Sequence, residues 1–448
     1  MDGVSLETVA GWGRHPVALG AVSRPEHLRL PPDGLAVLPR GLGRSYGDAA
    51  VPAAPGARVL ETSRADRALA FATASGLLTC EAGLSLDEVV RVFLPRGWFP
   101  PVTPGTRFVT VGGCVACDVH GKNHHRDGSF GGFVERLVVQ TADGRLVECG
   151  PTRERELFLA TVGGMGLTGL ITEVTFRLVP VQTAWMIVET EPVAGLTAML
   201  DGLRAAASAW PYTVGWIDCL ARGPALGRGI LMRGRHAARG EAPAAPPSEP
   251  RRISVPLDAP GWLLRPALMR GFNSAYYGRR ARRPGGPART VPYQGFFYPL
   301  DAIGGWNRLY GRRGFLQYQC VIPRAAGAAP VAEVLERVAA AGAASFLAVI
   351  KDCGPEADAY LSFPLEGTTL ALDLAYHGAA TESLVHELNA TVIAAGGRIY
   401  LAKDAATRAQ DFALMVPRLD EWRRVRDRWD PERRFRSALS VRLLGDRP

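Results

Sequence analysis

Along the first 180 residues, apolar positions mostly alternate with polar ones, which predicts short strands. Two short helices are expected between them, one beginning at Ser85, whose hydroxyl suits a helix N-cap, and one over residues 154–159. The strands are expected at residues 59–60, 77–81 and 170–179, with a hairpin over 133–148 that turns at residues 142–144.

From residue 181 the pattern changes to strands that alternate with longer helices. Strands are expected at residues 185–191, 212–220, 314–322, 345–350 and 369–374, and helices at 196–207, 331–341 and 383–395. This alternation predicts one antiparallel sheet with helices on one face. Residues 240–250 are low in complexity, and we expect them to be disordered. From residue 399 the chain is expected to return to the first domain, with its last helix at 418–429.

The most unusual stretch is Pro104 to Gly132, which holds seven glycines, three histidines and two cysteines. A backbone without Cβ atoms can approach a flat or charged ligand closely. The run Val109, Thr110, Val111 predicts a strand, followed by a tight turn at Gly112-Gly113. A glycine-rich loop with surface histidines is the alternative reading of this stretch alone.

Three segments in a fixed order carry a family resemblance: PRGLGRSYGD at 39–48, PGTRFVTVGGCVACDVHGKNHH at 104–125 and ELFLATVGGMGLTGLITEVTF at 156–176. Together they resemble the flavin-binding domain of the vanillyl-alcohol oxidase / p-cresol methylhydroxylase superfamily. GWGR, WNRLYG, GFLQYQCVIP and GGRIYLAKD extend the similarity to the decaprenylphosphoryl-ribose oxidases, over nearly the whole chain except about residues 223–291.

The resemblance implies an α+β fold in two domains. A PCMH-type FAD-binding domain would span residues 1–180, a substrate domain with an antiparallel sheet 181–397, and a segment returning to the FAD-binding domain 398–448. The length of 448 residues suits two domains.

The loop at residues 40–48 would hold the pyrophosphate of FAD through backbone N–H groups. It lacks the G-x-G-x-x-G pattern followed by a helix, so no Rossmann fold is predicted. Many relatives carry a histidine here that bonds covalently to the flavin, whereas this chain has Tyr46, so we predict non-covalent FAD. The resemblance implies these cofactor-binding residues: Arg40, Gly41, Leu42, Gly43, Arg44, Ser45, Tyr46, Pro104, Gly105, Thr106, Val109, Gly112, Gly113, Cys117, His120, Gly121, Gly169, Ile171, Tyr400 and Ala402.

His120 and Lys403 are the predicted catalytic residues, because the family places a histidine and a lysine beside the flavin at these positions. An imidazole exchanges protons near neutral pH, and burial lowers the pKa of a lysine. A hydrogen-bonded structural histidine and a surface lysine paired with Asp404 are the alternatives.

Substrate contacts are predicted from one strand and from the family positions. Gln317 and Gln319 stand two residues apart, so both face one side of their strand. Two amides on one face are costly against a dry core, which favours contact with substrate or flavin, with an exposed sheet face as the alternative. The resemblance adds Trp216, Phe297, Thr369, Ala371 and Lys403 as substrate-binding residues.

This chain departs from the ribose oxidases in the predicted pocket. Their asparagine and cysteine, which flank an isoleucine, correspond to Thr369 and Ala371 around Leu370, and a pocket tyrosine corresponds to Phe297 beside Tyr298. The redox residues are kept while the pocket is altered, which places the polyprenyl-phosphoryl-ribose substrate in doubt.

Cys114 and Cys117 form a C-x-x-C pair with histidines close behind. There is no second cysteine pair at zinc-ribbon spacing, so buried thiols near the flavin are favoured over a metal site.

The composition, with 47% hydrophobic and 21% charged residues, is that of a globular protein. No apolar run reaches eighteen residues, so no transmembrane segment is expected. The N-terminus shows no basic start with an apolar block, and the seven cysteines are scattered, which together favour the cytoplasm.

The net charge is +9, and positive charge is concentrated in the segment YGRRARRPGGPART, which holds Arg279, Arg280, Arg282, Arg283 and Arg289. A solvated, mobile loop is the favoured interpretation, because no aromatic residues interleave for nucleic-acid binding. The alternative is a lip that steers a phosphorylated or nucleotide-linked substrate.

The sequence thus predicts an FAD-dependent oxidoreductase that converts a hydroxyl of a neutral or anionic sugar or sugar conjugate to a carbonyl, with oxygen or another acceptor taking the electrons. Its alanine- and arginine-rich composition favours a specialised bacterial pathway such as antibiotic biosynthesis. The alternatives are the decaprenylphosphoryl-ribose 2-oxidase of cell-wall arabinan synthesis and a flavin-binding protein without turnover.

Overall fold

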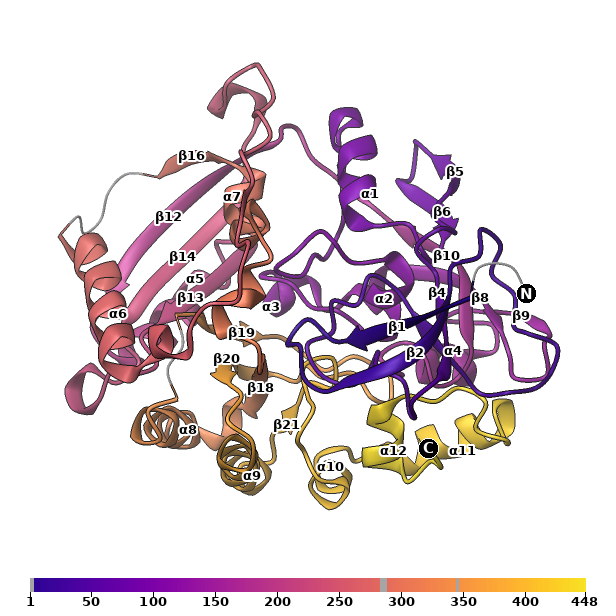
Figure 1. The fold of residues 1–448 in the computed structure, drawn as a ribbon. Coiled ribbons are helices and arrows are strands. Elements are labelled where there is room, and N and C mark those ends of the chain that lie inside the picture. The colour runs from indigo at the N-terminus through magenta and orange to yellow at the C-terminus, as the bar shows by residue number, and fades with distance from the viewer. Residues whose placement is uncertain (1–3, 283–287, 344–345) are drawn as a thin grey trace.

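A computed structural model describes residues 4–282, 288–343 and 346–448. Its N-terminal part carries two sheets side by side (Figure 1). The first has the strand order β1 (Ser5–Ala10), β2 (Val17–Ser23), β4 (Ala57–Glu61) and β3 (Val37–Arg40). The second has the order β5 (Ala68–Ala72), β6 (Leu77–Glu81), β10 (Leu170–Arg177), β8 (Val134–Gln140) and β9 (Leu146–Cys149).

Helices α1 (Leu86–Phe93), α2 (Val111–Ala116), α3 (His124–Asp127) and α4 (Arg155–Thr161) complete this part. Helix α1 begins as predicted, with the Ser85 hydroxyl accepting a hydrogen bond from the Glu88 amide. The predicted strand at 109–111 is wrong, because Val111 opens α2. The Thr110 hydroxyl accepts from the Gly113 amide, and this N-cap outweighs the strand preference of β-branched residues.

The second part is one antiparallel sheet of eight strands, as the sequence predicts. Its order is β16 (Arg289–Pro292), β12 (Trp185–Val193), β14 (Gly229–His236), β13 (Tyr212–Ile217), β19 (Ala348–Cys353), β20 (Gly367–Ala375), β18 (Phe315–Pro323) and β21 (Arg398–Ile399). The strand expected at 345–350 is displaced to Ala348–Cys353, and Ser345 lies outside the described residues.

The strand register defines the face that later forms a site. Gln319 pairs with Ala371, Ala371 with Val349, and Val349 with Trp216. Directly paired residues share a face of the sheet, so these side chains lie in one row across four strands.

Helices cover both faces of this sheet, which corrects the prediction of one covered face. Helices α5 (Leu196–Ala206) and α9 (Ala379–Ala394) pack on the face opposite to Gln319, with α8 (Ala329–Ala340) beside α9. Helix α6 (Pro266–Ala281) lies on the Gln319 face, where Tyr276 contacts the Trp216 ring edge-on, with centroids 4.7 Å apart. The residues of α6 alone do not indicate which face of the sheet the helix covers.

Two segments expected to be mobile are ordered where the structure describes them. Arg279 and Arg280 end helix α6 rather than lying in a loop, while Arg283 falls outside the described residues. Within residues 240–250, the Ala245 carbonyl accepts from the Trp185 indole at 3.0 Å, and the Glu249 carboxylate binds Arg107 at 2.9 Å. These bonds tie the low-complexity segment to the protein.

The C-terminal segment forms β21 and then α10 (Ala409–Met415), α11 (Leu419–Trp429) and α12 (Ala438–Leu444). It reaches the N-terminal part, since α11 packs on α4, Phe435 bridges to Val37, and Arg442 binds Asp48 at 2.8 Å. The helix at 419–429 is not the last, because Ser437 caps α12. The boundaries at residues 180 and 397 stay a prediction. None of the helices within the described ranges has the length and apolarity to cross a membrane.

Candidate active site

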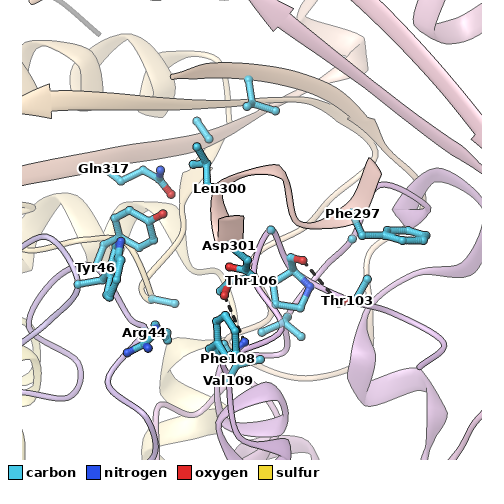
Figure 2. A pocket seen from close by; sticks show the side chains of 18 of the residues that line it. Arg44, Tyr46, Thr103, Thr106, Phe108, Val109, Phe297, Leu300, Asp301 and Gln317 are labelled. Atoms are coloured by element: carbon cyan, nitrogen blue, oxygen red, sulfur yellow. Dashed lines mark hydrogen bonds between the residues drawn. The ribbon is translucent and has the colours of Figure 1, made fainter. Parts of the chain in front are cut away.

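One cavity of about 1260 Å³ lies between the glycine-rich loops of the N-terminal part and the Gln319 face of the large sheet. All the residues predicted to bind cofactor or substrate, except Thr369, line it. Figure 2 shows Tyr46 and Gln317 on one side of this space and Phe297 and Thr103 on another. The structure therefore brings the predicted residues together, while their contacts with FAD and substrate stay predictions.

The loop after β3 has the features of an anion cradle. Within the described residues, the backbone N–H groups of residues 41–45 donate to no protein acceptor, although all five residues line the cavity. Successive free amides of this kind bind phosphate groups. A Cβ on Gly41 would lie 2.3 Å from the Thr110 hydroxyl oxygen, so only glycine allows the loop to approach α2. These features fit the pyrophosphate of FAD.

Three buried polar side chains, Gln319, His120 and Lys351, form a cluster with His120 at its centre. The Gln319 amide nitrogen lies 3.0 Å from His120 Nε2, and Lys351 Nζ contacts His120 Nδ1. Lys351 also donates to the Gly121 carbonyl at 2.7 Å. We call Gln319, His120 and Lys351 the histidine cluster.

Both ring nitrogens of His120 are occupied by protein groups. Burial lowers the pKa of His120 well below its usual value, and the nearby Lys351 ammonium lowers it further. Burial also lowers the pKa of Lys351 to about 8. His120 is thus a neutral ring held in one orientation, which fits a group that positions others better than a free proton acceptor.

A second polar cluster lies around Gln317. The Gln317 amide donates to Asp373 Oδ1 at 2.5 Å, and the Tyr310 hydroxyl donates to Asp373 Oδ2 at 2.9 Å. Asp373 is fully buried, and burial raises its pKa to about 7.

Lys403 completes this second cluster. Its Nζ lies 3.6 Å from the centroid of the Tyr46 ring. Burial lowers the pKa of Lys403 to about 7, although the Asp373 carboxylate acts in the opposite direction. We call Lys403, Tyr46, Gln317 and Asp373 the lysine cluster. Asp404, the partner expected for a surface lysine, binds Arg442 instead at 2.9 Å.

Lys403 differs from His120 because its nitrogen is free to bind a ligand in the cavity. Within the described part of the chain, its ammonium group has a ring contact but no hydrogen bond or ion pair. A lysine with a pKa near 7 is partly neutral at physiological pH, and its lone pair can then accept a proton from a ligand in the cavity.

Two predicted substrate residues, Thr369 and Phe297, differ in their access to the cavity. Thr369 stands behind Gln319, where its hydroxyl lies 3.3 Å from the amide nitrogen and donates to the Cys320 carbonyl at 2.8 Å. Phe297 lines the cavity, whereas the Tyr298 hydroxyl turns away to Thr103 at 2.7 Å. The neighbouring tyrosine therefore does not replace the hydroxyl that Phe297 lacks.

Among the described residues, no group of three His, Cys, Asp or Glu side chains is placed to hold a metal ion, at the C-x-x-C pair or elsewhere. Cys117 lines the cavity, and burial raises the pKa of its thiol to about 11, so it stays protonated.

Sequence reasoning missed Lys351 and Asp373. Each had one signal, a charged residue inside an apolar strand, in AVIKDC and LALDLA respectively. Buried charges of this kind need partners and often mark a functional site.

Comparisons with known proteins indicate the family of the chain. Residues 30–150 match a family model described as an FAD binding domain, and residues 315–443 match one described as D-arabinono-1,4-lactone oxidase. Decaprenylphosphoryl-beta-D-ribose oxidase of Mycolicibacterium smegmatis is 37% identical over 98% of this chain and 98% of its own. A Streptomyces coelicolor protein, from the mprA 5' region and uncharacterized, is 34% identical over 80% of this chain and 100% of its own. The human Delta(24)-sterol reductase is 27% identical over 28% of this chain.

Proposed function

The chain belongs to the family of PCMH-type FAD-dependent oxidoreductases acting on CH–OH groups that includes decaprenylphosphoryl-beta-D-ribose oxidase, and we propose that it oxidises a hydroxyl of a sugar or sugar conjugate to a carbonyl. In this proposal the FAD is held without a covalent bond. The amides of residues 41–45 and the glycines of α2 would hold it.

FAD, when bound, supplies an acceptor for the hydride that leaves the carbinol carbon. The chain must then remove the hydroxyl proton, so that the oxygen can form the new double bond. Lys403 carries this part of the proposal, because it is the cavity lysine with a lowered pKa and no hydrogen-bonded partner within the described residues. Asp373 lies close enough to influence its charge.

The two glutamines would orient the substrate, and His120, whose ring nitrogens both face protein groups, would hold Gln319 in place rather than exchange protons. Gln317 is fixed by Asp373 and Gln319 by Thr369, so each amide presents a defined edge to the cavity. Fixed polar groups hold a substrate in one reacting geometry at little entropic cost.

The first test follows the flavin spectrum. Purified protein with FAD is mixed without oxygen with a panel of free sugars, sugar phosphates, nucleotide-linked sugars and nucleosides. We expect at least one compound to bleach the oxidised flavin absorption near-stoichiometrically and to yield a carbonyl product. If every compound leaves the spectrum unchanged, the proposed oxidation is wrong and a flavin-binding protein without turnover becomes the better account.

The mode of FAD attachment is tested by acid precipitation. A flavin that moves to the supernatant is non-covalent, as the tyrosine at position 46 predicts. Yellow colour that stays with the pellet would contradict this part of the proposal.

A second candidate function is the oxidation of decaprenylphosphoryl ribose itself. The observation in its favour is the identity of 37% across 98% of both chains. Rapid flavin reduction by a polyprenylphosphoryl ribose, with none by any soluble sugar compound, would favour this candidate over a broader sugar oxidase.

A further inference from the structure

Helix α12, at the yellow end of the chain in Figure 1, carries a guanidinium group that joins two loops of the candidate site. Arg442 binds both carboxylate oxygens of Asp48, at 2.8 Å each, and its Nη2 lies 2.9 Å from Asp404 Oδ2. Asp48 ends the cradle loop at residues 40–48, and Asp404 directly follows Lys403. We call Asp48, Arg442 and Asp404 the arginine bridge.

The same two loops also meet through their backbones. The Tyr46 amide donates to the Ala402 carbonyl at 2.8 Å, and the Asp48 amide donates to the Asp404 carbonyl at 3.3 Å. A Cβ on Gly47 would lie 1.7 Å from the Asp404 carbonyl oxygen, so this approach requires glycine. The two loops therefore run side by side, and the arginine bridge ties their side chains together.

The contact between the loops sets the position of the proposed proton acceptor. Lys403 Nζ lies 3.6 Å from the centroid of the Tyr46 ring, and both residues line the cavity. Tyr46 directly follows the free amides of residues 41–45. A shift of one loop against the other would therefore move the ammonium group relative to the anion cradle.

Arg442 also holds the turn that follows Lys403. Asp404 Oδ1 accepts hydrogen bonds from the amides of Ala406 and Thr407, at 3.2 and 3.0 Å, which leaves Oδ2 for the guanidinium. Arg442 donates in addition to the Thr407 carbonyl. The guanidinium thus contacts this turn at its first and last residues.

Stability alone is a weak explanation for the arginine bridge. One guanidinium faces two carboxylates, and burial raises the pKa of Asp48 although the charge of Arg442 acts in the opposite direction. Removing such groups from water costs about as much free energy as their attraction returns. The planar guanidinium does fix geometry, because its N–H groups point at carboxylates in set directions.

We propose that Arg442 is a positioning residue, which holds Lys403 at a fixed place relative to the cradle loop. This inference rests on the role proposed for Lys403 in hydroxyl oxidation. The linkage acts in both directions, so a ligand that restrains the cradle loop also restrains residues 402–407 through Arg442. Residues 402–407 therefore respond to FAD even where they do not touch it.

The first test measures hydrogen–deuterium exchange of residues 402–407 in the full-length protein with and without saturating FAD. We expect FAD to slow this exchange by about fivefold or more in the unaltered chain and by no more than about twofold in Arg442→Met. Equal slowing in both proteins, or no slowing in either, overturns the proposal.

Arg434→Met is the matched control for these measurements. Arg434 is buried and also joins the C-terminal segment to the N-terminal part, but it donates to the carbonyls of Pro31 and Ala142 rather than to the cradle loop. FAD should slow the exchange of residues 402–407 in Arg434→Met as much as in the unaltered chain.

The second test uses FAD-loaded protein and a compound that reduces the flavin. Arg442→Met should lower the maximal rate of flavin reduction by about ten- to a hundredfold, because Lys403 loses its place. The dissociation constant of the substrate should change by less than about threefold, since the two glutamines keep their partners. Arg442→Lys should recover part of the rate, because an ammonium group carries the charge without the fork. Arg434→Met should keep the full rate.

The outcomes separate the positioning role from the proposed oxidation. If Arg442→Met reduces the flavin as fast as the unaltered chain, or is slowed only through weaker substrate binding, the positioning role fails while hydroxyl oxidation stands. If no compound reduces the flavin in any protein but the FAD-dependent protection of residues 402–407 still requires Arg442, hydroxyl oxidation fails while the linkage between the loops stands.

Discussion

Two of the lysines that line the cavity, Lys351 and Lys403, differ in what surrounds them. Lys351 in the histidine cluster donates to the Gly121 carbonyl and contacts His120. Lys403 in the lysine cluster rests on the Tyr46 ring, with Asp373 nearby as the group that opposes the fall of its pKa. Burial lowers the pKa of both, to about 8 and about 7. The comparison separates a lysine that fixes its neighbours from one that can exchange a proton.

The difference arises at two positions of one strand that stand two residues apart. Gln317 and Gln319 point to the same face of β18, yet one binds the carboxylate of Asp373 and the other the ring of His120. An acid beside a lysine can share a proton with it, whereas a neutral imidazole flanked by an amide and an ammonium is held still.

The largest effect is expected from Lys403→Met. Without the proton acceptor, the rate of flavin reduction by a substrate should fall by about 10²- to 10⁴-fold, the usual share of general base catalysis. Stopped-flow absorbance under anaerobic conditions measures it, and Lys403→Arg should be equally slow because a guanidinium does not deprotonate. A fall of less than tenfold would assign the proton to another group.

Lys351→Met should have a smaller kinetic effect and a clear cost in stability. The Gly121 carbonyl and His120 Nδ1 would each lose a buried partner, so the free energy of unfolding should drop by about 1–3 kcal/mol. Flavin reduction should slow by about ten- to a hundredfold through misorientation. Urea unfolding and stopped-flow traces on the same variant separate the two effects. A rate loss as large as that of Lys403→Met would reverse the assignment of the two lysines.

The pH dependence sharpens the comparison further. Lys403 must be neutral to accept a proton, so the rate of flavin reduction should rise with pH through about 7. The Asp373 carboxylate raises the pKa of Lys403, so Asp373→Asn should lower it and move the midpoint to lower pH, by up to about one unit. Asp352→Asn, which changes a buried aspartate bound to Thr368, should leave the midpoint in place. A midpoint that moves upward would contradict the arrangement.

The smallest effects are expected from restoring the residues of the ribose oxidases. Ala371 lines the cavity, so Ala371→Cys should change KM for a polyprenylphosphoryl ribose by up to about tenfold. Thr369 stands behind Gln319, so Thr369→Asn should change it less, by about twofold. Steady-state assays of each single variant show the ranking, and the opposite order would mean that Thr369 reaches the substrate.

Local signals predicted the parts of the fold that local chemistry decides. The alternating run of β18 correctly places Gln317 and Gln319 on one face, and Ser85 correctly marks the start of α1. The strand predicted at residues 109–111 is wrong because Val111 opens helix α2. The Thr110 hydroxyl caps that helix at Gly113, and the glycines there show neither a strand nor a helix pattern in the sequence.

Long-range contacts decide what the sequence could not show. Lys351 meets His120 across 231 positions of the chain, and Tyr310 meets Asp373 across 63. The periodic pattern of apolar and polar residues does not reveal contacts between residues so far apart in the chain. Helix α6 lies over the cavity through its contacts with β12 and β14, which its own residues do not encode.

Strand β18 also fixes the distance between the two glutamines that it carries. Residues two apart on an extended strand are separated by roughly 7 Å, and the hydrogen bonds to β20 and β21 prevent that spacing from changing. A molecule that engages both amides must carry its polar groups at that spacing, whatever is attached beyond them. The enzyme could thus exchange the distant part of its substrate during evolution while the size of the reacting ring stayed constant.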